Sequence, residues 1–433
     1  MKKTAIILLI VLPSLCHAQT GYSARSMGLA GAYQSQARGA DANNWNPANL
    51  ALPGNPAFSL DLLNAAVSIG NNSINLSLYN NYFSEAYFDE NGSWDDAAKQ
   101  EILSYIPASG FQGFNRAQFT ALAVSFRQYN FAVNTFAYSD VRLPFQLFAI
   151  PLQGLGTDPI PLNDIEGEAV VGTELAFSTA QRILIPGLEE ECFSVGATVR
   201  YLLGHAYAKI AQAGGSVLSN EDSISVEGSY LVQLAGLAAE DGGSGSGAGF
   251  DLGAALTLQR RWTFGLSFHN VLGGIRFGTV EERSGKYSFQ QPGLNIDEFD
   301  HFEEYIDSVS VSEDTTLVSQ AGVRYDLPKS LLLSANYRFS DRLVLEADFQ
   351  QGLNRTAGGS TTPRIALGAE IRRLSFLPVR FGIALGGVQG STMAFGFGLD
   401  FKHYKLDISA ADQRGFFNHS KGVNYALSQR IVF

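Results

Sequence analysis

Ser267 and His269 are the two residues of this sequence whose types and spacing could support nucleophilic catalysis. They lie two positions apart, so on an extended strand both side chains point to one face, where the hydroxyl could act as nucleophile and the imidazole as general base. Polar residues at this spacing also arise by chance along the polar face of a strand that lines a wet interior. We therefore predict no catalytic residue and expect that the protein is not an enzyme.

The spacing of the other polar clusters does not favour ion or phosphate binding. The run DHFEEYID, from Asp300 to Asp307, has carboxylates at helical spacing, but it lacks the glycine-punctuated ligands of a calcium loop, so a solvated helix face is expected. The histidines show no paired spacing typical of zinc sites. The stretch GGSGSGAG at 242–249 lacks the Lys-Ser/Thr pair of a phosphate loop and is interpreted as a flexible tip. The sequence predicts no metal and no cofactor.

The N-terminus has the features of a secretory signal peptide. Two lysines precede an apolar run from Ala5 to Leu12, and small Ala18 ends the short tail that follows. This pattern predicts cleavage after residue 18. A lipoprotein signal would need a small residue before Cys16, where this sequence has leucine. We therefore interpret residues 1–18 as a signal peptide and expect an exported protein.

The composition restricts the partners and the kind of membrane crossing. Charged residues make up 16% of the chain, against roughly 25% in average soluble proteins. The net charge is −11, and loss of the two signal-peptide lysines makes it two units more negative, which argues against nucleic acid as a partner. After the signal only Cys192 remains, so no internal disulfide can form. No later stretch reaches the ~18 to 20 apolar residues of a membrane helix, so any crossing must use strands.

Most of the chain alternates between apolar residues and small or polar ones. In the run from Val379 to Leu385, large apolar side chains alternate with Arg, Gly and Ala, and the run from Met393 to Phe401 repeats the pattern. A period of two is typical of β-strands whose two faces meet different surroundings. The same pattern covers Phe193–Leu203, Phe250–Leu258, Trp262–His269, Leu333–Phe339, Leu343–Phe349 and Val423–Phe433.

A soluble β-sandwich also alternates, and three observations favour a membrane barrel instead. The polar face holds Gly, Ala and Ser with isolated charges, the strands are about 9 to 12 residues long, close to the ~9 to 11 needed to cross tilted, and the final Phe433 still belongs to the apolar face. Charged residues avoid the alternate strand positions that would face lipid, as expected because a lipid-facing Arg or Lys costs about 2 to 4 kcal/mol. We predict an all-β fold, a transmembrane antiparallel β-barrel of about 14 strands, with 16 as the alternative, whose first and last strands pair.

The connections predict an orientation. The short ones, at Arg338–Leu343 and Asp400–Lys405, are interpreted as periplasmic turns. The longer polar ones, at 352–362 and 412–421, are interpreted as external loops. This arrangement places the C-terminus on the periplasmic side.

Two further stretches have helical rather than strand-like patterns. The first is Glu85–Ile106, in which Ser93 could cap a helix with acidic residues in its first turn. The second is Leu294–Val309, which has apolar residues at helical spacing among acids. We expect both helices to lie in long connections between strands.

The segment from Gly21 to Leu52 precedes the first expected strand and does not alternate. It contains an Ala-x-x-Met-Gly-x-x-Gly-Ala-Tyr core and a later Asn-Pro-Ala turn, built from Ala24, Met27, Gly28, Gly31, Ala32, Tyr33, Ala42, Asn43 and Asn46–Leu50. In these residues the chain resembles the N-terminus of the FadL/TodX-type outer-membrane proteins and their PorV-like relatives. It departs from that pattern at Trp45, before the turn, and at Asn49, where glycine is usual.

The resemblance implies that residues 19–55 fold as a plug, or hatch, inside a barrel formed by residues 56–433. It also implies that the Asn-Pro-Ala turn lies on the path of a hydrophobic ligand. The residue types fit, because glycine permits close packing, proline fixes a turn and asparagine can pair backbone groups. The hatch and ligand residues expected are Asn46, Pro47, Ala48, Trp45, Met27, Gly28 and Gly31, and the last strand, with Tyr425 and Phe433, resembles the signal recognised by the barrel assembly machinery.

The function implied by the resemblance is uptake of hydrophobic small molecules, such as long-chain fatty acids or aromatics, across the outer membrane of a Gram-negative cell. The alternative is a PorV-like protein that secretes or attaches partner proteins at the surface, and a structural barrel without traffic is a third interpretation. The expected partners are a hydrophobic small-molecule ligand, outer-membrane lipid and the barrel assembly machinery, with a secreted protein under the alternative. The expected location is the cell outer membrane, crossed many times as a β-barrel. The ligand, the oligomeric state and a lateral opening in the wall stay undecided.

Overall fold

The computed structural model describes residues 23–155, 158–184, 191–219, 223–240, 242–292, 310–319 and 322–433. The expected signal peptide at residues 1–18 and the expected helix at Leu294–Val309 lie outside these residues. Within the described residues, no helix is both long enough and apolar enough to cross a membrane.

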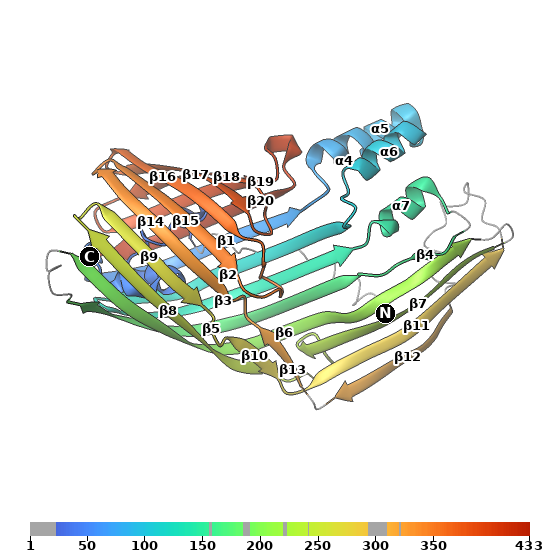
Figure 1. Cartoon of the computed structure of the whole chain (residues 1–433), viewed down its shortest axis with the longest axis horizontal. Helices are drawn as coiled ribbons and strands as arrows, with labels where there is room; N and C mark the ends of the chain where they lie inside the picture. Colours follow the sequence, from blue (N-terminus) through green and yellow to red (C-terminus); the bar gives the residue numbers. More distant parts are fainter. Residues whose placement is uncertain are drawn as a thin grey trace.

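Fourteen antiparallel strands form a closed β-barrel (Figure 1). The last strand returns to the first, because Gly422–Val432 pairs with Phe58–Asn71 from Ser59 opposite Val432 to Gly70 opposite Gly422. The prediction of 14 strands and of pairing between the first and last strands is therefore confirmed. In ring order the strands are β1 (Phe58–Asn71), β2 (Phe111–Phe126), β3 (Tyr129–Leu143), β5 (Glu166–Ile183), β6 (Cys192–Ser219), β8 (Gly245–Leu258), β9 (Trp262–His269), β14 (Ser330–Ser340), β15 (Leu343–Gly352), β16 (Arg364–Leu374), β17 (Leu377–Gly386), β18 (Thr392–Asp400), β19 (Tyr404–Gln413) and β20 (Gly422–Val432).

The alternating pattern places apolar side chains on the outside of the barrel. On β17, Phe381 and Ile383 are 49% and 51% exposed, whereas Arg380 and Ala384 are buried in the interior. Strand β18 follows the same rule, with Phe395 outside. A ring of this kind satisfies every ladder hydrogen bond without a free edge, which is what a bilayer requires. The outer face is thus suited to lipid and the inner face is polar.

Strand β6 is 28 residues long and continues past the ring. Its far part pairs with β7 (Ser223–Gly236), which pairs with β11 (Val280–Pro292), which pairs with β12 (Ser310–Ser319). These strands make an extension sheet that projects from one side of the barrel (Figure 1). The short strands β4 (Ile160–Pro161), β10 (Gly274–Phe277) and β13 (Val323–Asp326) complete the sheet.

We expected the stretch at 242–249 to be a flexible tip. It is not one throughout, because β8 begins at Gly245. Gly245 and Gly247 lie in strand pairing with β6, and Gly247 also pairs with β10. A Cβ on Gly247 would lie 1.8 Å from the carbonyl oxygen of Gly274. Glycine is therefore used here for close backbone approach rather than for flexibility.

The two ends of the barrel differ. One end, which we call the turn end, carries the short connections and the C-terminus, where the Val432 amide donates to the His403 carbonyl oxygen over 2.8 Å. The opposite end, which we call the loop end, carries the long connections at 353–363 and 414–421 together with the helices (Figure 1). These helices are α4 (Leu76–Tyr82), α5 (Glu85–Asn91), α6 (Asp96–Ser104), α7 (Gln146–Gln153) and η4 (Phe417–His419).

Helices do form in the stretch Glu85–Ile106, but the expected cap is wrong. The side chain of Asp95, not Ser93, accepts a hydrogen bond from the Ala98 amide at the start of α6. Asp95 places its carboxylate at the amide of the third residue after it, which is the usual N-cap geometry. Ser84 caps α5 in the same way.

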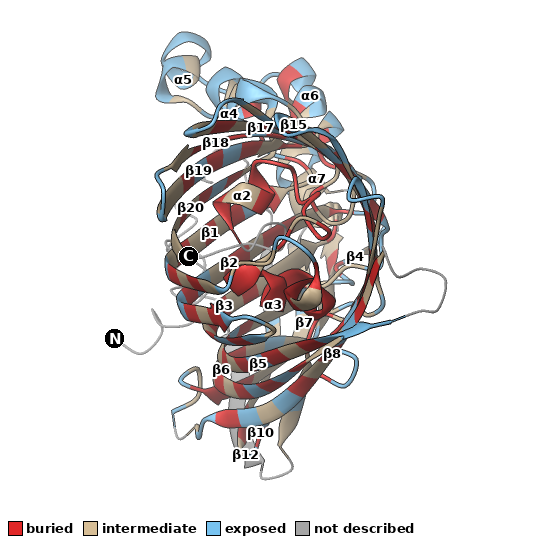
Figure 2. Ribbon diagram, turned by 90° about the vertical axis from the view of Figure 1, so that its left-hand side faces the viewer, coloured by how far each residue is buried: buried red, intermediate tan, exposed pale blue. Residues whose placement is uncertain are grey.

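The residues before β1 fold inside the ring as a plug. The plug contains α2 (Ala24–Met27), η1 (Gly39–Asp41), α3 (Ala42–Trp45) and η2 (Pro47–Ala51). Figure 2 shows α2 and α3 within the ring of strands, coloured as buried. The barrel thus has no single apolar core, and its interior is filled by the plug and by clusters of wall side chains.

Candidate functional site: the plug and the lumen cavity

Small residues on the inner face of the wall allow the plug to dock with its backbone. A Cβ on Gly382 of β17 would lie 2.1 Å from the Leu29 carbonyl carbon, and one on Gly196 of β6 would lie 2.5 Å from the Ala48 nitrogen. A Cβ on Gly28 of the plug would lie 3.0 Å from the Cα of Gly396 on β18. These wall glycines, Gly196, Gly382 and Gly396, face the lumen and form the surface on which the plug docks, which we call the glycine seat.

Ion pairs hold the plug at two places. The Arg25 guanidinium donates to both carboxylate oxygens of Glu370 on β16, each over 3.1 Å. Asp41 of the plug accepts from Arg430 on β20 over 2.5 Å, and Arg430 also binds Asp61 on β1. These charges are buried or nearly so, and a buried charge that loses its partner is strongly destabilising. Both pairs therefore fix the plug to the wall.

Carboxylates of β15 accept hydrogen bonds from the plug backbone. Asp348 accepts from the amides of Tyr33 and Gln34, each over 3.0 Å, and Glu346 accepts from the Ser35 amide over 2.6 Å. The Tyr33 hydroxyl donates to Asp41 over 2.7 Å. Burial, and then the nearby Asp41 carboxylate, raise the pKa of Tyr33, so this hydroxyl keeps its proton and remains a donor.

The Asn-Pro-Ala turn is fully buried against β8 and β9. The Asn46 side chain accepts from the Ala48 amide and so caps η2, while its Nδ2 donates to the carbonyl oxygens of Ala254 and Leu266 over 3.0 and 3.3 Å. Pro47 stands at the first turn of η2, where its missing N–H is not needed. Asn49, one of the two residues that depart from the FadL/TodX-type pattern, donates to the Gln34 carbonyl over 2.7 Å and ties two parts of the plug together.

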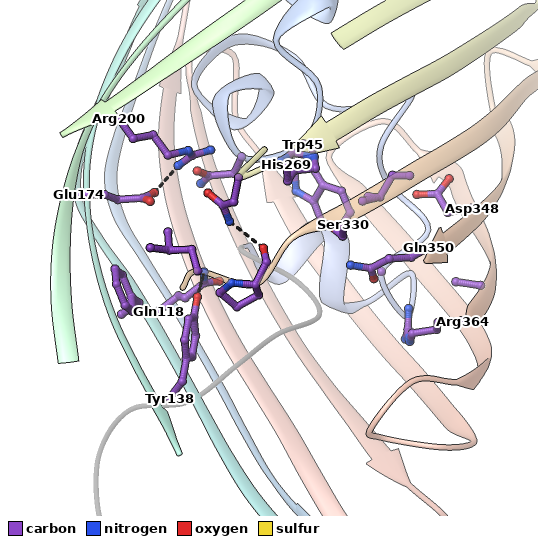
Figure 3. Close-up of a pocket in the computed structure, with 18 residues that line it drawn as sticks. Trp45, Gln118, Tyr138, Glu174, Arg200, His269, Ser330, Asp348, Gln350 and Arg364 are labelled. Carbon is purple, nitrogen blue, oxygen red and sulfur yellow. Dashed lines mark hydrogen bonds and ion pairs between the residues drawn. The ribbon is translucent and has the colours of Figure 1, made fainter. Parts of the chain in front are cut away.

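A cavity of about 60 Å³ lies between the plug and the wall (Figure 3). Two of the expected site residues, Trp45 and Gly31, line it from the plug. The other five, Met27, Gly28, Asn46, Pro47 and Ala48, do not line it and pack within the plug or against the wall. The wall residues that line it are Gln118, Phe136, Tyr138, Glu174, Arg200, His269, Asn270, Leu327, Pro328, Ser330, Leu332, Asp348, Gln350, Arg364 and Ala366, and Asn44 joins them from the plug.

Charged residues that the sequence did not single out dominate one side of this cavity. Arg200 of β6 binds Glu174 of β5 and, over 2.5 Å, Asp251 of β8. On the other side, Arg364 donates through one terminal nitrogen to the Ala30 carbonyl oxygen over 2.7 Å, and its Nε has no hydrogen-bond partner among the described residues. Figure 3 shows Arg200 and Glu174 on one side of Trp45 and Arg364 on the other. In the sequence, the only indication of these cavity residues was that each is an isolated charge at a strand position expected to face the lumen.

Ser267 and His269 do lie together, with a 2.9 Å distance between Oγ and Nε2. His269 Nδ1 lies 3.6 Å from Asp251, so the three residues follow the order of a serine hydrolase triad. Ser267 is nevertheless fully buried, and the Gln34 side chain of the plug donates to its hydroxyl over 2.9 Å. Asp251 already forms an ion pair with Arg200. In this arrangement the three residues form a polar link between the plug and the wall.

No group of three or more His, Cys, Asp or Glu residues that could hold a metal ion occurs in the part of the chain that the structure describes.

Phe433 and Tyr425 lie on the outer face at 61% and 55% exposure. The Phe433 ring stacks on His403 with centroids 4.5 Å apart and contacts Phe58 at 6.1 Å. The role of these two aromatic residues as an assembly signal stays a prediction.

The closed ring of 14 strands with an internal plug defines the class: a transmembrane β-barrel of the outer-membrane type. The chain belongs to the family described as "Family of unknown function (DUF5723)", whose profile matches residues 47–410. No curated protein matches the sequence.

Solved structures share the fold at low sequence identity. The chain is similar to the CymD monoaromatic hydrocarbon channel, with a TM-score of 0.51, 14% identity and coverage of 95% of this chain and 98% of that one. It is similar to the P. putida toluene transporter TodX, with a TM-score of 0.50, 12% identity and coverage of 96% and 99%. For a Pseudomonas aeruginosa FadL homologue the TM-score is 0.49, with 14% identity and coverage of 96% and 99%. The first two likenesses show that the described part of the chain shares its fold with these channels.

Proposed function

We propose that the protein takes up small hydrophobic or amphipathic molecules across the outer membrane, through a lumen that its N-terminal plug controls. The observation that carries the proposal is the cavity at the boundary between plug and wall, which Trp45 borders from the plug. The channel and transporter that share the fold, CymD and TodX, are described as handling monoaromatic hydrocarbons and toluene.

The lining favours a ligand with one polar end. Leu332 packs in one apolar cluster with Trp45, and Leu327 and Phe136 add apolar surface to the lining. The Arg364 Nε–H, in contrast, is a buried donor without a partner among the described residues. A purely apolar ligand would leave this donor unsatisfied, which is unfavourable in a buried site. A carboxylate would accept from it in a charge-assisted hydrogen bond. A ligand that ends in a carboxylate, such as a fatty acid, therefore satisfies this donor better than a bare hydrocarbon.

Passage requires the plug to shift, because the plug backbone contacts the glycine seat without a gap. The plug is held by the ion pairs at Arg25 and Asp41 and by the acceptors on β15. Full expulsion would break all of these contacts together. A local rearrangement around Trp45 and the Asn-Pro-Ala turn, with the ion pairs kept, is the smaller change, and we propose that it releases the ligand.

Uptake of a labelled long-chain fatty acid tests the proposal. Cells carrying the wild-type protein, a deletion, and the variants Trp45→Ala, Asn46→Ala and Pro47→Ala would be compared. Trp262→Ala is the matched control, because this tryptophan lies on the outer face at 39% exposure. We expect uptake to fall in the deletion and in the three plug variants but not in the control. Equal uptake in the wild type and the deletion would eliminate the transport function.

The alternative function, secretion or surface attachment of a partner protein, is favoured by one observation. The extension sheet formed by β6, β7, β11 and β12 projects beyond the ring and is not needed to close it. Replacing residues 212–231 by a short Gly-Ser turn would remove most of β7 and the far part of β6. It would leave the β5–β6 pairing, which ends at Ile210 opposite Gly167, and the β6–β8 pairing, which ends at Gly204 opposite Gly245. Loss of a co-purifying secreted protein, with fatty-acid uptake unchanged, would support this alternative.

A further inference from the structure

The connection between β15 and β16, residues 353–363, does not stay at the rim of the barrel. Its tip, Thr356, Ala357 and Gly358, contacts β3 and β5. In the ring, four strands separate β5 from β15 on one side and six separate β3 from β16 on the other. The tip therefore reaches the opposite wall of the barrel. We call these three residues the latch.

The latch donates three hydrogen bonds to two carboxylates of that wall. The Ala357 amide and the Thr356 hydroxyl donate to Oε2 of Glu168 over 2.7 and 3.1 Å, and the Gly358 amide donates to Oδ2 of Asp140 over 2.9 Å. Asp140 and Glu168 face each other across β3 and β5. Hydrogen bonds from backbone amides to ionised carboxylates are stronger than those between neutral groups.

The wall holds this receptor in place independently of the latch. Arg116 donates to both oxygens of Asp140 over 2.5 and 2.7 Å, and the Tyr207 hydroxyl donates to Oε1 of Glu168 over 2.9 Å. The two carboxylates are therefore positioned by β2 and β6 before the latch reaches them. A preformed receptor of this kind does not have to be ordered when the loop docks.

The latch also fits sterically. Ala357 is 1% exposed and lies in an apolar cluster with Phe136, Tyr138 and Tyr325, and the Tyr325 hydroxyl donates to its carbonyl oxygen over 2.5 Å. Gly358 has a φ of +88°, and a Cβ there would lie 2.5 Å from the Tyr138 ring. Only glycine meets both the backbone conformation and the close contact.

The latch lies next to the cavity on the side away from the plug. Tyr138 lines the cavity and contacts Gly358, and Asp140 follows it on the same face of β3, one step nearer the loop end. The plug thus lines the cavity directly, whereas the latch packs against the lining residue Tyr138. We propose that the latch is a second closure of the lumen, which opens by release of the β15–β16 connection from Asp140 and Glu168 and which acts independently of the plug.

Cysteine accessibility in the purified full-length protein in detergent tests the latch. Gln118→Cys places a thiol in the cavity, in a Cys192→Ser background. Its rate of reaction with a charged methanethiosulfonate reagent would be compared with and without Gly358→Val. The control is Gly154→Val, since Gly154 also has a positive φ, of +80°, lies at the loop end and has open space around it.

We expect Gly358→Val to speed labelling at least tenfold and Gly154→Val to leave the rate unchanged. The double variant Asp140→Asn/Glu168→Gln removes the carboxylates while keeping their shape, and it should speed labelling in the same direction. Heat-modifiable electrophoretic mobility would verify that each variant has folded as a barrel. Equal rates in the parent, Gly358→Val and the double variant would overturn the proposal. Because no solute uptake is measured, the result does not depend on the proposed function.

Discussion

Replacing Gly382 by alanine should push the plug off the barrel wall. Gly382 lies on β17, where the added Cβ would meet the carbonyl carbon of Leu29 at 2.1 Å and the nitrogen of Ala30 at 2.3 Å. These are backbone atoms of the plug, so they cannot rotate away as the end of a side chain could. Either the strand or the plug must move, and the strand is held by ladders on both sides.

The size of the effect follows from the overlap. Overpacking a close-packed interior typically costs about 1 to 3 kcal/mol, and a clash with backbone belongs at the upper end of this range. A change of about 3 kcal/mol shifts the equilibrium between docked and undocked plug by roughly a hundredfold. Gly249→Ala is the control, because its Cβ would lie 3.5 Å from the Arg200 side chain, which is ordinary contact.

Limited trypsin digestion of the detergent-purified protein measures this shift. Arg38 lies in the plug between α2 and η1, and cleavage after it needs the plug to leave the lumen. We expect the rate of this cut, followed by mass spectrometry, to rise by about two orders of magnitude in Gly382→Ala, as the ~3 kcal/mol shift requires. Gly249→Ala should be cut as slowly as the wild type. A Gly382→Ala protein in which the plug remains fully protected would show that the wall glycines are not the seat of the plug.

Three more changes test the anchors and the last strand. Arg25→Gln should loosen the plug by about 1 to 3 kcal/mol because Glu370 loses a bidentate donor but keeps two other arginine partners, and faster trypsin cleavage in the plug would measure it; an unchanged rate would contradict the anchor. Asn46→Ala should lower the free energy of unfolding by about 1 to 2 kcal/mol through loss of the η2 cap, whereas Asn46→Ser, which keeps a neutral cap acceptor, should lose less; equal melting temperatures for the two variants would argue against capping. Deletion of Phe433 should reduce the fraction of chains that reach the outer membrane as heat-modifiable barrel, and normal levels would dismiss its role in assembly.

The barrel wall could be predicted from the sequence because its rule is local. Successive side chains of a strand point to opposite faces, so the alternation at Val379–Leu385 already separates the lipid face from the lumen. The requirement that a sheet in hydrocarbon has no free edge then gave pairing of the first and last strands. The flexible tip expected at 242–249 was wrong because glycine signals either a turn or a close backbone approach, and only the neighbouring strands decide between them.

The candidate site could be predicted only in part. The motif pointed to the plug, and two of its residues, Trp45 and Gly31, line the cavity. The pairing of Arg200 with Glu174 and Asp251 joins three strands, and no local pattern contains that information. The contact of the β15–β16 connection with the opposite wall is likewise a long-range event, in which residues near 357 meet a strand about two hundred positions earlier.

The pairing of β1 with β20, which closes the ring, joins the first and last strands of the barrel in chain order. The first strand of the ring, β1, cannot pair with β20 until β20 has been translated and exported. The segment that fills the interior is tethered directly to that first strand, since η2 ends at Ala51 and β1 begins at Phe58. The plug is therefore translated and exported ahead of every strand of the ring, and it is available to occupy the lumen before β20 can close the ring against β1.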